Sequence, residues 1–175
     1  MKRIDVLQLI SEHSFNICVA GTRGKTTIST MIAHILRHTG YGCNAFLGGI
    51  ATNYQTNFWS HERNVCVIEA DEYDRSFLKL SPDIAVISAM DPDHLDIYGT
   101  AAEMEDAYIG FTEKIRSGGL LLSRKGLSRE KDLVSGHHDT YHLSDNNATV
   151  YAKNLRVEAG SYRYGLVWRT EDIGE

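Results

Sequence analysis

One glycine-rich segment near the N-terminus holds the residues best suited to chemistry: Gly21-Thr22-Arg23-Gly24-Lys25-Thr26-Thr27. Backbone N–H groups in such a turn point at phosphate oxygens, and the start of a helix adds roughly half a positive charge. A lysine at this place reaches the terminal phosphates of a nucleotide, and the hydroxyl that follows it binds Mg²⁺. The full P-loop pattern has an earlier glycine where this sequence has Val19, so the match consists of Gly21 and the Gly-Lys-Thr. We predict that residues 21–27 bind a nucleotide.

A second segment joins an apolar run directly to a cluster of carboxylates. Residues 65–70 predict a buried strand that carries Glu69 near its end, and Asp71, Glu72 and Asp74 follow. In open α/β sheets ligands bind at the carboxyl ends of strands, and a carboxylate facing a phosphate loop is expected to contact a metal ion. We predict Glu69 as that ligand. We interpret the other three carboxylates as caps of the next segment or as residues that face water.

A third segment, Asp91-Pro92-Asp93-His94-Leu95-Asp96, follows another predicted strand, residues 84–88. A histidine binds metal well when a neighbouring carboxylate fixes its ring, so we predict His94 as a metal ligand oriented by Asp93 or Asp96. This prediction depends on three segments that point to the same chemistry, because three successive strand ends each carry one part of a metal and phosphate site.

The elements that must position these residues alternate between strands and helices. Residues 16–20 predict a buried strand that enters the glycine turn. Apolar residues then recur with the spacing of an amphipathic helix that ends near Gly40: Ile28, Met31, Ile32, Ile35 and Leu36. Further strands are predicted at residues 43–47, 65–70, 84–88 and 120–123, and a second helix at residues 104–115.

None of these strands shows a clean alternation of apolar and polar residues, which indicates a parallel sheet covered on both faces. From about Thr140 the segments alternate and are rich in tyrosine and valine, which predicts antiparallel strands. The predicted fold class is therefore α/β and P-loop-containing. Its mainly parallel sheet is flanked by helices and has a small antiparallel β appendage at the C-terminal end.

The composition is typical of one compact globular domain, with 175 residues of which 42% are apolar and 23% charged. The net charge is −5, and residues 69–106 hold eleven acids against two bases, which argues against a nucleic-acid surface there. No apolar run is long enough for a membrane helix, and the N-terminus lacks the pattern of a signal peptide. Cys18, Cys43 and Cys66 are interpreted as reduced core thiols. We predict a cytoplasmic protein with no nucleic-acid partner and no membrane insertion.

Three motifs in order, G-T-x-G-K-T-T, E-A-D-E-Y-D-x-S-F-L and D-P-D-H-L-D-I-Y-G, resemble the central ATP-binding domain of the Mur ligases. The resemblance implies an amide-forming ligase of peptidoglycan precursor synthesis, with ATP and Mg²⁺ as cofactors. The carboxylate of UDP-N-acetylmuramate would take the γ-phosphoryl group of ATP, and L-alanine would attack the resulting acyl phosphate. By similarity, Lys25 would contact the terminal phosphates, Thr26 the first Mg²⁺, Glu69 a metal ion and His94 the second Mg²⁺.

Two positions distinguish branches within this family. Position 23 is arginine where the alanine-adding members usually have histidine, which adds a positive charge beside the phosphates. Ile109 stands where later ligases carry a carbamylated lysine, which fits the alanine-adding branch. The segment Phe46-Leu47-Gly48-Gly49-Ile50 resembles the glycine-rich loop on the substrate side, so Asn53 and Asn57 are candidate substrate contacts. An ordinary polar loop is the alternative.

By the same resemblance, residues 15–175 are expected to be the central ATP-binding domain, C-terminally incomplete. Residues 1–14 are expected to be a linker or helix leading in from a missing N-terminal domain, and the chain alone is expected to be inactive as a ligase. One alternative is the related ligase that recycles a murein tripeptide. The other is a nucleotide-binding module without catalysis of its own, which would not need the pair Glu69 and His94.

Overall fold

The computed structural model describes residues 2–93 and 95–174. Its α-helices are α1 (Arg3–Ser11), α2 (Lys25–His38), α3 (Leu95–Tyr98) and α4 (Ala101–Thr112), and its 3₁₀ helices are η1 (Tyr73–Lys79) and η2 (Glu130–Asp132). The strands are β1 (Phe15–Ala20), β2 (Asn44–Ala51), β3 (Thr56–Trp59), β4 (Val65–Glu69), β5 (Ile84–Ile87), β6 (Leu120–Arg124), β7 (His137–His142), β8 (Val150–Glu158), β9 (Ser161–Trp168) and β10 (Glu171–Gly174).

The strands of the described part form one sheet in the order β10-β9-β8-β7-β6-β5-β1-β4-β2-β3. The pairs from β2 through β4, β1, β5, β6 and β7 to β8 are parallel, whereas β3, β9 and β10 pair antiparallel. Strand β1 lies between β4 and β5, with Val19 opposite Glu69 and Ala20 opposite Ile87. The three strand ends that carry the candidate residues are therefore neighbours, as the sequence predicts.

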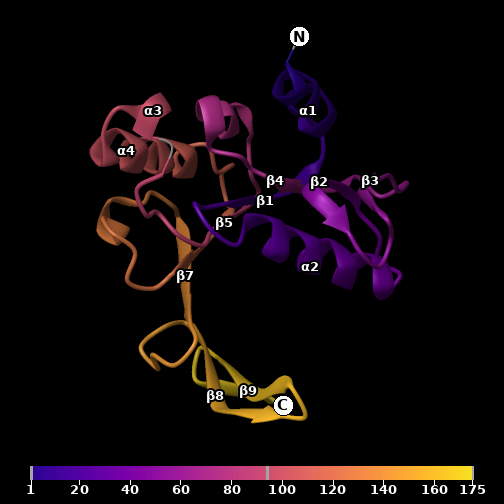
Figure 1. The fold of residues 1–175 in the computed structure, drawn as a ribbon, viewed down its shortest axis with the longest axis vertical. Coiled ribbons are helices and arrows are strands. Elements are labelled where there is room, and N and C mark those ends of the chain that lie inside the picture. Colours follow the sequence, from indigo (N-terminus) through magenta and orange to yellow (C-terminus); the bar gives the residue numbers. More distant parts are fainter. Residues whose placement is uncertain (1, 94, 175) are drawn as a thin grey trace.

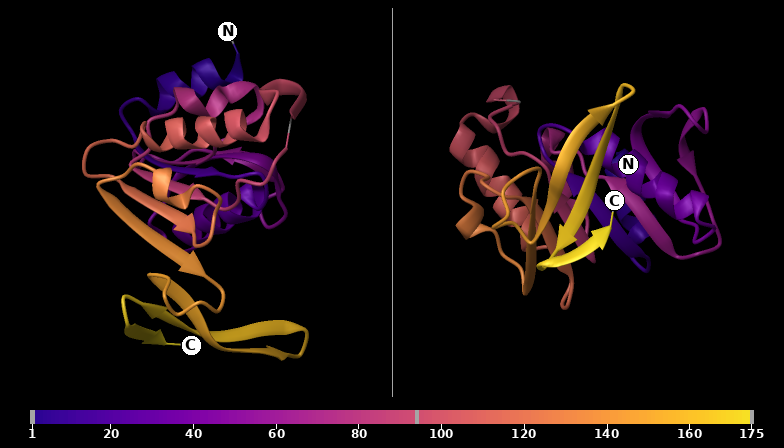
Figure 2. Two further views of the ribbon diagram at one scale, coloured as in Figure 1. Left: turned by 90° about the vertical axis from the view of Figure 1, so that its left-hand side faces the viewer. Right: turned by 90° about the horizontal axis from the view of Figure 1, so that it is seen from below.

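Helices cover both faces of the parallel strands, which confirms the predicted fold class. Figure 2 shows α1, η1 and α4 on one face and α2 on the other. Successive strand residues alternate between the two layers, so that Cys18 and Ile68 belong to one core and Ala45 and Val67 to the other. Because both faces are buried, these strands need apolar residues at nearly every position.

The buried face of α2 agrees with the prediction only in part, since Ile32 and Leu36 pack against the core below the helix. Met31 and Ile35 are 58% and 55% exposed, whereas Ser29 and Ala33 have no exposed surface. Small side chains let a helix approach a sheet closely, and here they mark the contact with β1, β2 and β4. The apolar spacing identified the helix and part of its buried face, but the most deeply buried positions are the small residues Ser29 and Ala33.

The antiparallel part begins later than predicted. Strand β7 pairs parallel to β6, and β8 joins β7 in parallel at Tyr141 and Val150 before β9 and β10 turn back. Figure 1 shows β8 and β9 as a lobe at the opposite end of the molecule from the N-terminus. Strand β7 is half-buried along most of its length and lies between β6 and β8, and its polar composition gave no sign of this parallel pairing.

Other features of the chain agree with the sequence. The three cysteines are free and buried, as predicted. Residues 3–11 of the predicted lead-in segment form α1, which packs on η1. A preceding domain stays a prediction. Among residues 2–93 and 95–174, no helix has the length and apolar character needed to cross a membrane.

Candidate phosphate and metal site

The glycine turn joins the end of β1 to the start of α2 and is fastened to the end of β5. Gly21 has φ +136°, and a Cβ there would lie 2.3 Å from Ser88 Oγ, so no other residue fits without displacement. Gly24 has φ +83° and forms the N-cap of α2. Thr22 N donates to Ala89 O at 3.1 Å, and the Ser88 hydroxyl donates to the carbonyl of Arg23. These contacts tie the turn to the end of β5.

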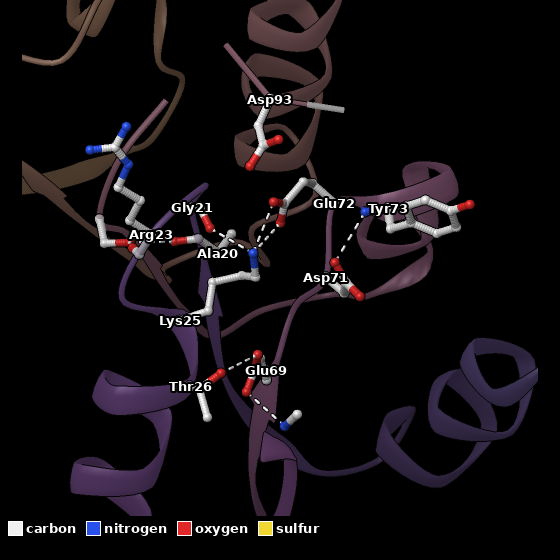
Figure 3. Close-up of polar contacts among 12 residues, drawn as sticks. Ala20, Gly21, Arg23, Lys25, Thr26, Glu69, Asp71, Glu72, Tyr73 and Asp93 are labelled. Carbon is white, nitrogen blue, oxygen red and sulfur yellow. Dashed lines mark hydrogen bonds and ion pairs between the residues drawn. The ribbon is translucent and has the colours of Figure 1, made fainter. Parts of the chain in front are cut away.

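Lys25 begins α2, and its side chain turns back over the glycine turn. The ammonium donates to Gly21 O at 2.9 Å and lies 2.8 Å from each carboxylate oxygen of Glu72 (Figure 3). The side chain of Glu72 is fully buried, and that of Lys25 is 15% exposed. The interpretation of Glu72 as a capping or water-facing residue is therefore wrong. Asp71 and Asp74 are exposed, as expected.

Sequence reasoning missed Glu72 because strand-end carboxylates usually face water. Glu72 comes three residues after Glu69 and directly before η1, and nothing in this local sequence distinguishes it from its exposed neighbours Asp71 and Asp74.

Thr26 and Glu69 are brought together, so Glu69 lies beside the phosphate turn, as predicted. The Thr26 hydroxyl donates to Glu69 Oε1 at 2.8 Å, and Gly48 N donates to Glu69 Oε2 at 2.7 Å. A Cβ on Gly48 would lie 2.4 Å from Glu69 Oε1, so the glycine makes room for the carboxylate. A hydroxyl and a carboxylate are hard oxygen ligands that fit Mg²⁺, which usually takes one or two protein ligands and completes its shell with water and phosphate oxygens.

The third strand-end loop follows β5. Asp91 Oδ2 lies 3.7 Å from Arg23 Nε, and both side chains are largely exposed. Asp93 N donates to Met104 Sδ at 3.4 Å, and Figure 3 shows the carboxylate of Asp93 pointing toward Glu72. His94 lies outside the described residues, so its predicted metal role stays a prediction. Within the described ranges, no three His, Cys, Asp or Glu side chains are grouped closely enough to hold a metal.

The candidate substrate residues lie apart from each other. Asn53 is in the turn between β2 and β3 and lines a cavity of about 210 Å³ beside α2. Asn57 is in β3 and lines a different cavity, of about 350 Å³, together with Arg3 and Phe58. The expected glycine-rich loop is in fact part of strand β2, and it is Gly48 of that strand that reaches the candidate metal site.

Two buried tyrosines stand behind the site. Tyr98 donates its hydroxyl to Glu72 O at 2.5 Å. Burial, reinforced by the charge of Glu72, raises the pKa of Tyr98 to about 12, and the same two causes raise the pKa of Tyr108 further. Both hydroxyls therefore keep their protons at neutral pH.

The parallel sheet, the glycine turn before α2 and the lysine, threonine and carboxylate around it define a P-loop-containing α/β domain. Residues 19–173 match the family described as the Mur ligase middle domain, and the chain belongs to the Mur ligase family. The resemblance seen in the three motifs is thus confirmed.

A curated relative, the UDP-N-acetylmuramate–L-alanine ligase of Parabacteroides distasonis, is 46% identical over 168 residues, covering 95% of this chain and 36% of the relative. The chain therefore spans about a third of that relative's length.

Solved structures agree in fold. The UDP-N-acetylmuramate-alanine ligase MurC of Thermotoga maritima aligns with a TM-score of 0.79 at 23% identity, covering 95% of this chain and 36% of that one. A MurF ligase of Thermotoga maritima, solved in complex with ADP, aligns with a TM-score of 0.69 at 14% identity, covering 98% of this chain and 44% of the other. At these identities the likeness concerns the fold alone.

Proposed function

We propose that this chain is the nucleotide-binding part of an ATP-dependent ligase that joins L-alanine to UDP-N-acetylmuramate. The observation that carries the proposal is the contact of Thr26 with Glu69 beside Lys25. These residues lie at the mouth of a turn in which Gly21 has no room for a side chain. The name of the relative in Parabacteroides distasonis supports the choice of substrates.

Different residues would bind the phosphates and the Mg²⁺ of the nucleotide. The turn residues Gly21, Thr22, Arg23, Gly24 and Thr27 would surround the phosphates with backbone N–H groups and side chains, and Lys25 would contact the terminal phosphates. Thr26 and Glu69 would hold Mg²⁺, and His94 is proposed for a second ion. ATP with Mg²⁺ supplies phosphoryl transfer that activates a carboxylate. Because both reactants are anions, the protein contributes mainly positioning and positive charge.

Calorimetric titration of ATP with Mg²⁺ tests the nucleotide site. We expect binding that Lys25→Met weakens strongly and that Lys131→Met leaves unchanged, since Lys131 is an exposed lysine of η2 remote in sequence from the turn. Removing Mg²⁺ with a chelator should weaken binding to wild type more than to Glu69→Gln. Equal heats for wild type and Lys25→Met would refute the assignment of the phosphate turn.

A second measurement tests the ligase reaction. It uses a longer protein that carries this chain together with the flanking regions that its relatives have. From that protein, phosphate release from ATP in the presence of UDP-N-acetylmuramate is expected with L-alanine and not with the murein tripeptide. The opposite preference would favour the recycling ligase, and release with neither would favour a binding module. The chain spans 36% of its relative, so we expect nucleotide binding from these 175 residues and no amide formation by them alone.

A further inference from the structure

The carboxylate of Glu72 is fully buried, yet it lies at the mouth of a site proposed to bind an anion. Its partner is the ammonium of Lys25, 2.8 Å from each of its oxygens. A buried carboxylate beside the phosphates repels the ligand, so its presence needs a reason. The contact with Lys25 supplies one.

Two of the three ammonium protons of Lys25 are used inside the protein. One goes to Gly21 O at 2.9 Å and one to the carboxylate of Glu72. An ammonium has three donors and no acceptor, so one N–H remains for a phosphate oxygen. Two fixed contacts from opposite sides leave the long lysine chain little freedom, which lowers the entropy lost when a ligand is bound.

The backbone of Glu72 is held as firmly as its side chain. The carbonyl of Glu72 accepts hydrogen bonds from Tyr98 Oη at 2.5 Å and from Arg75 N at 2.9 Å. Tyr98 is 2% exposed and ends α3, the helix that follows the loop of Asp91 and Asp93. Glu72 thus connects the phosphate turn to the third strand-end loop.

We propose that Glu72 is a positioning residue that fixes the Lys25 ammonium at the mouth of the phosphate turn. The inference rests on the proposed nucleotide site. Glu72 acts through Lys25 and itself makes no contact with the nucleotide. Its length holds the ammonium in place, and its charge balances the lysine when no nucleotide is bound.

Calorimetric titration of ATP with Mg²⁺ into two variants of Glu72 distinguishes the effect of its side-chain length from the effect of its charge. Glu72→Asp keeps the charge but withdraws the carboxylate, so Lys25 loses its place and ATP should bind roughly tenfold more weakly. Glu72→Gln keeps the length and removes the competing charge, so ATP should bind more tightly than to wild type. A merely structural role would weaken binding in both variants or in neither.

The same titration in the Lys25→Met background shows whether the effect passes through the lysine. There, Glu72→Asp should cause no further loss of ATP affinity. ATP binds weakly to the Lys25→Met variant, which limits the affinity differences that can be measured there. Tyr98→Phe, made in the wild-type chain, therefore serves as a second variant. It releases the carbonyl of Glu72 and should weaken ATP binding in the same direction as Glu72→Asp, by a smaller factor.

The nucleotide-free chain allows an independent measurement. In ¹H–¹⁵N spectra of the lysine ammonium groups, wild type should show one slowly exchanging signal that Glu72→Asp loses and that Lys131→Met keeps. Equal ATP affinity of wild type and Glu72→Asp, or no protected ammonium in wild type, would overturn the inference while leaving the proposed function intact. A wild type that does not bind ATP would overturn both.

Discussion

Replacing Lys25 by methionine should cost the nucleotide-free chain more stability than replacing Glu72 by glutamine, although each change breaks the same ion pair. The carboxylate of Glu72 is fully buried, whereas the side chain of Lys25 is 15% exposed. Removing one partner of a buried pair costs about 3–5 kcal/mol because the other charge is left uncompensated. Lys25→Met leaves a carboxylate that cannot reach water, so we expect a loss in that range.

Glu72→Gln leaves the ammonium of Lys25 with its bond to Gly21 O and a path to solvent along its own flexible chain. We expect a loss of about 1.5–3 kcal/mol, the usual contribution of one hydrogen bond to a charged group. The double variant has no buried charge at this place. It should therefore be more stable than Lys25→Met alone, since a buried pair and a neutral replacement of similar size are often equal in stability.

Urea unfolding followed by circular dichroism measures these differences, with Lys131→Met as the control expected to stay within about 0.5 kcal/mol of wild type. For a domain of this size the loss in Lys25→Met corresponds to a melting temperature lower by roughly 6–20 °C. The reasoning is refuted if Lys25→Met unfolds within about 1 kcal/mol of wild type, a range typical of an exposed ion pair. It is also refuted if the double variant is less stable than Lys25→Met.

Gly48→Ala would place a methyl group 2.4 Å from Glu69 Oε1, so calorimetry should show weaker Mg²⁺-dependent ATP binding; Gly136→Ala, with no atom within 4 Å, should show none of this loss. Burial lowers the pKa of His138 below its usual 6.5, so the stability contributed by the neutral ring is present above that pH and is lost as the pH falls through the lowered value. The difference in unfolding free energy between wild type and His138→Gln should shrink from about pH 7.5 to about pH 5.5, and a constant difference would contradict the argument. A thiol reagent should label none of Cys18, Cys43 and Cys66 in the native chain and all three after unfolding, because burial raises the pKa of each thiol. Rapid labelling of the native chain would contradict this prediction.

The fold could be predicted where local patterns and burial point the same way. The strand before Gly21, the turn and the helix after it form one unit whose glycine positions, lysine and apolar spacing agree. The rule that ligands bind at the carboxyl ends of parallel strands predicted that Glu69 lies beside the phosphate turn if their strands are neighbours, and β4 and β5 do flank β1. Thr26 and Glu69, far apart in the sequence, therefore lie in contact as predicted.

The errors arise where a tertiary contact outweighs the local pattern. Met31 and Ile35 satisfy the helical spacing but are exposed, because the buried face of the helix is centred on the small residues Ser29 and Ala33. A helix packs where its backbone can come close, and periodicity does not report that distance. Glu72 is a similar case, because only the folded position of Lys25 turns an ordinary surface residue into a buried one.

Glu69 and Glu72 differ in whether a neighbouring positive charge balances their own. The charge of Glu72 is taken up by Lys25, so this pair contributes little net field at the mouth of the turn. Glu69 accepts its hydrogen bonds from neutral donors, the Thr26 hydroxyl and Gly48 N, so its negative charge is not balanced within the contact. An unbalanced carboxylate beside a phosphate turn repels a bare polyphosphate and attracts a divalent cation. The acidic stretch that begins with the second motif is therefore compatible with the proposed anion binding, because one carboxylate pairs with the lysine and the charge of the other would be balanced by the proposed metal ion that accompanies the phosphates.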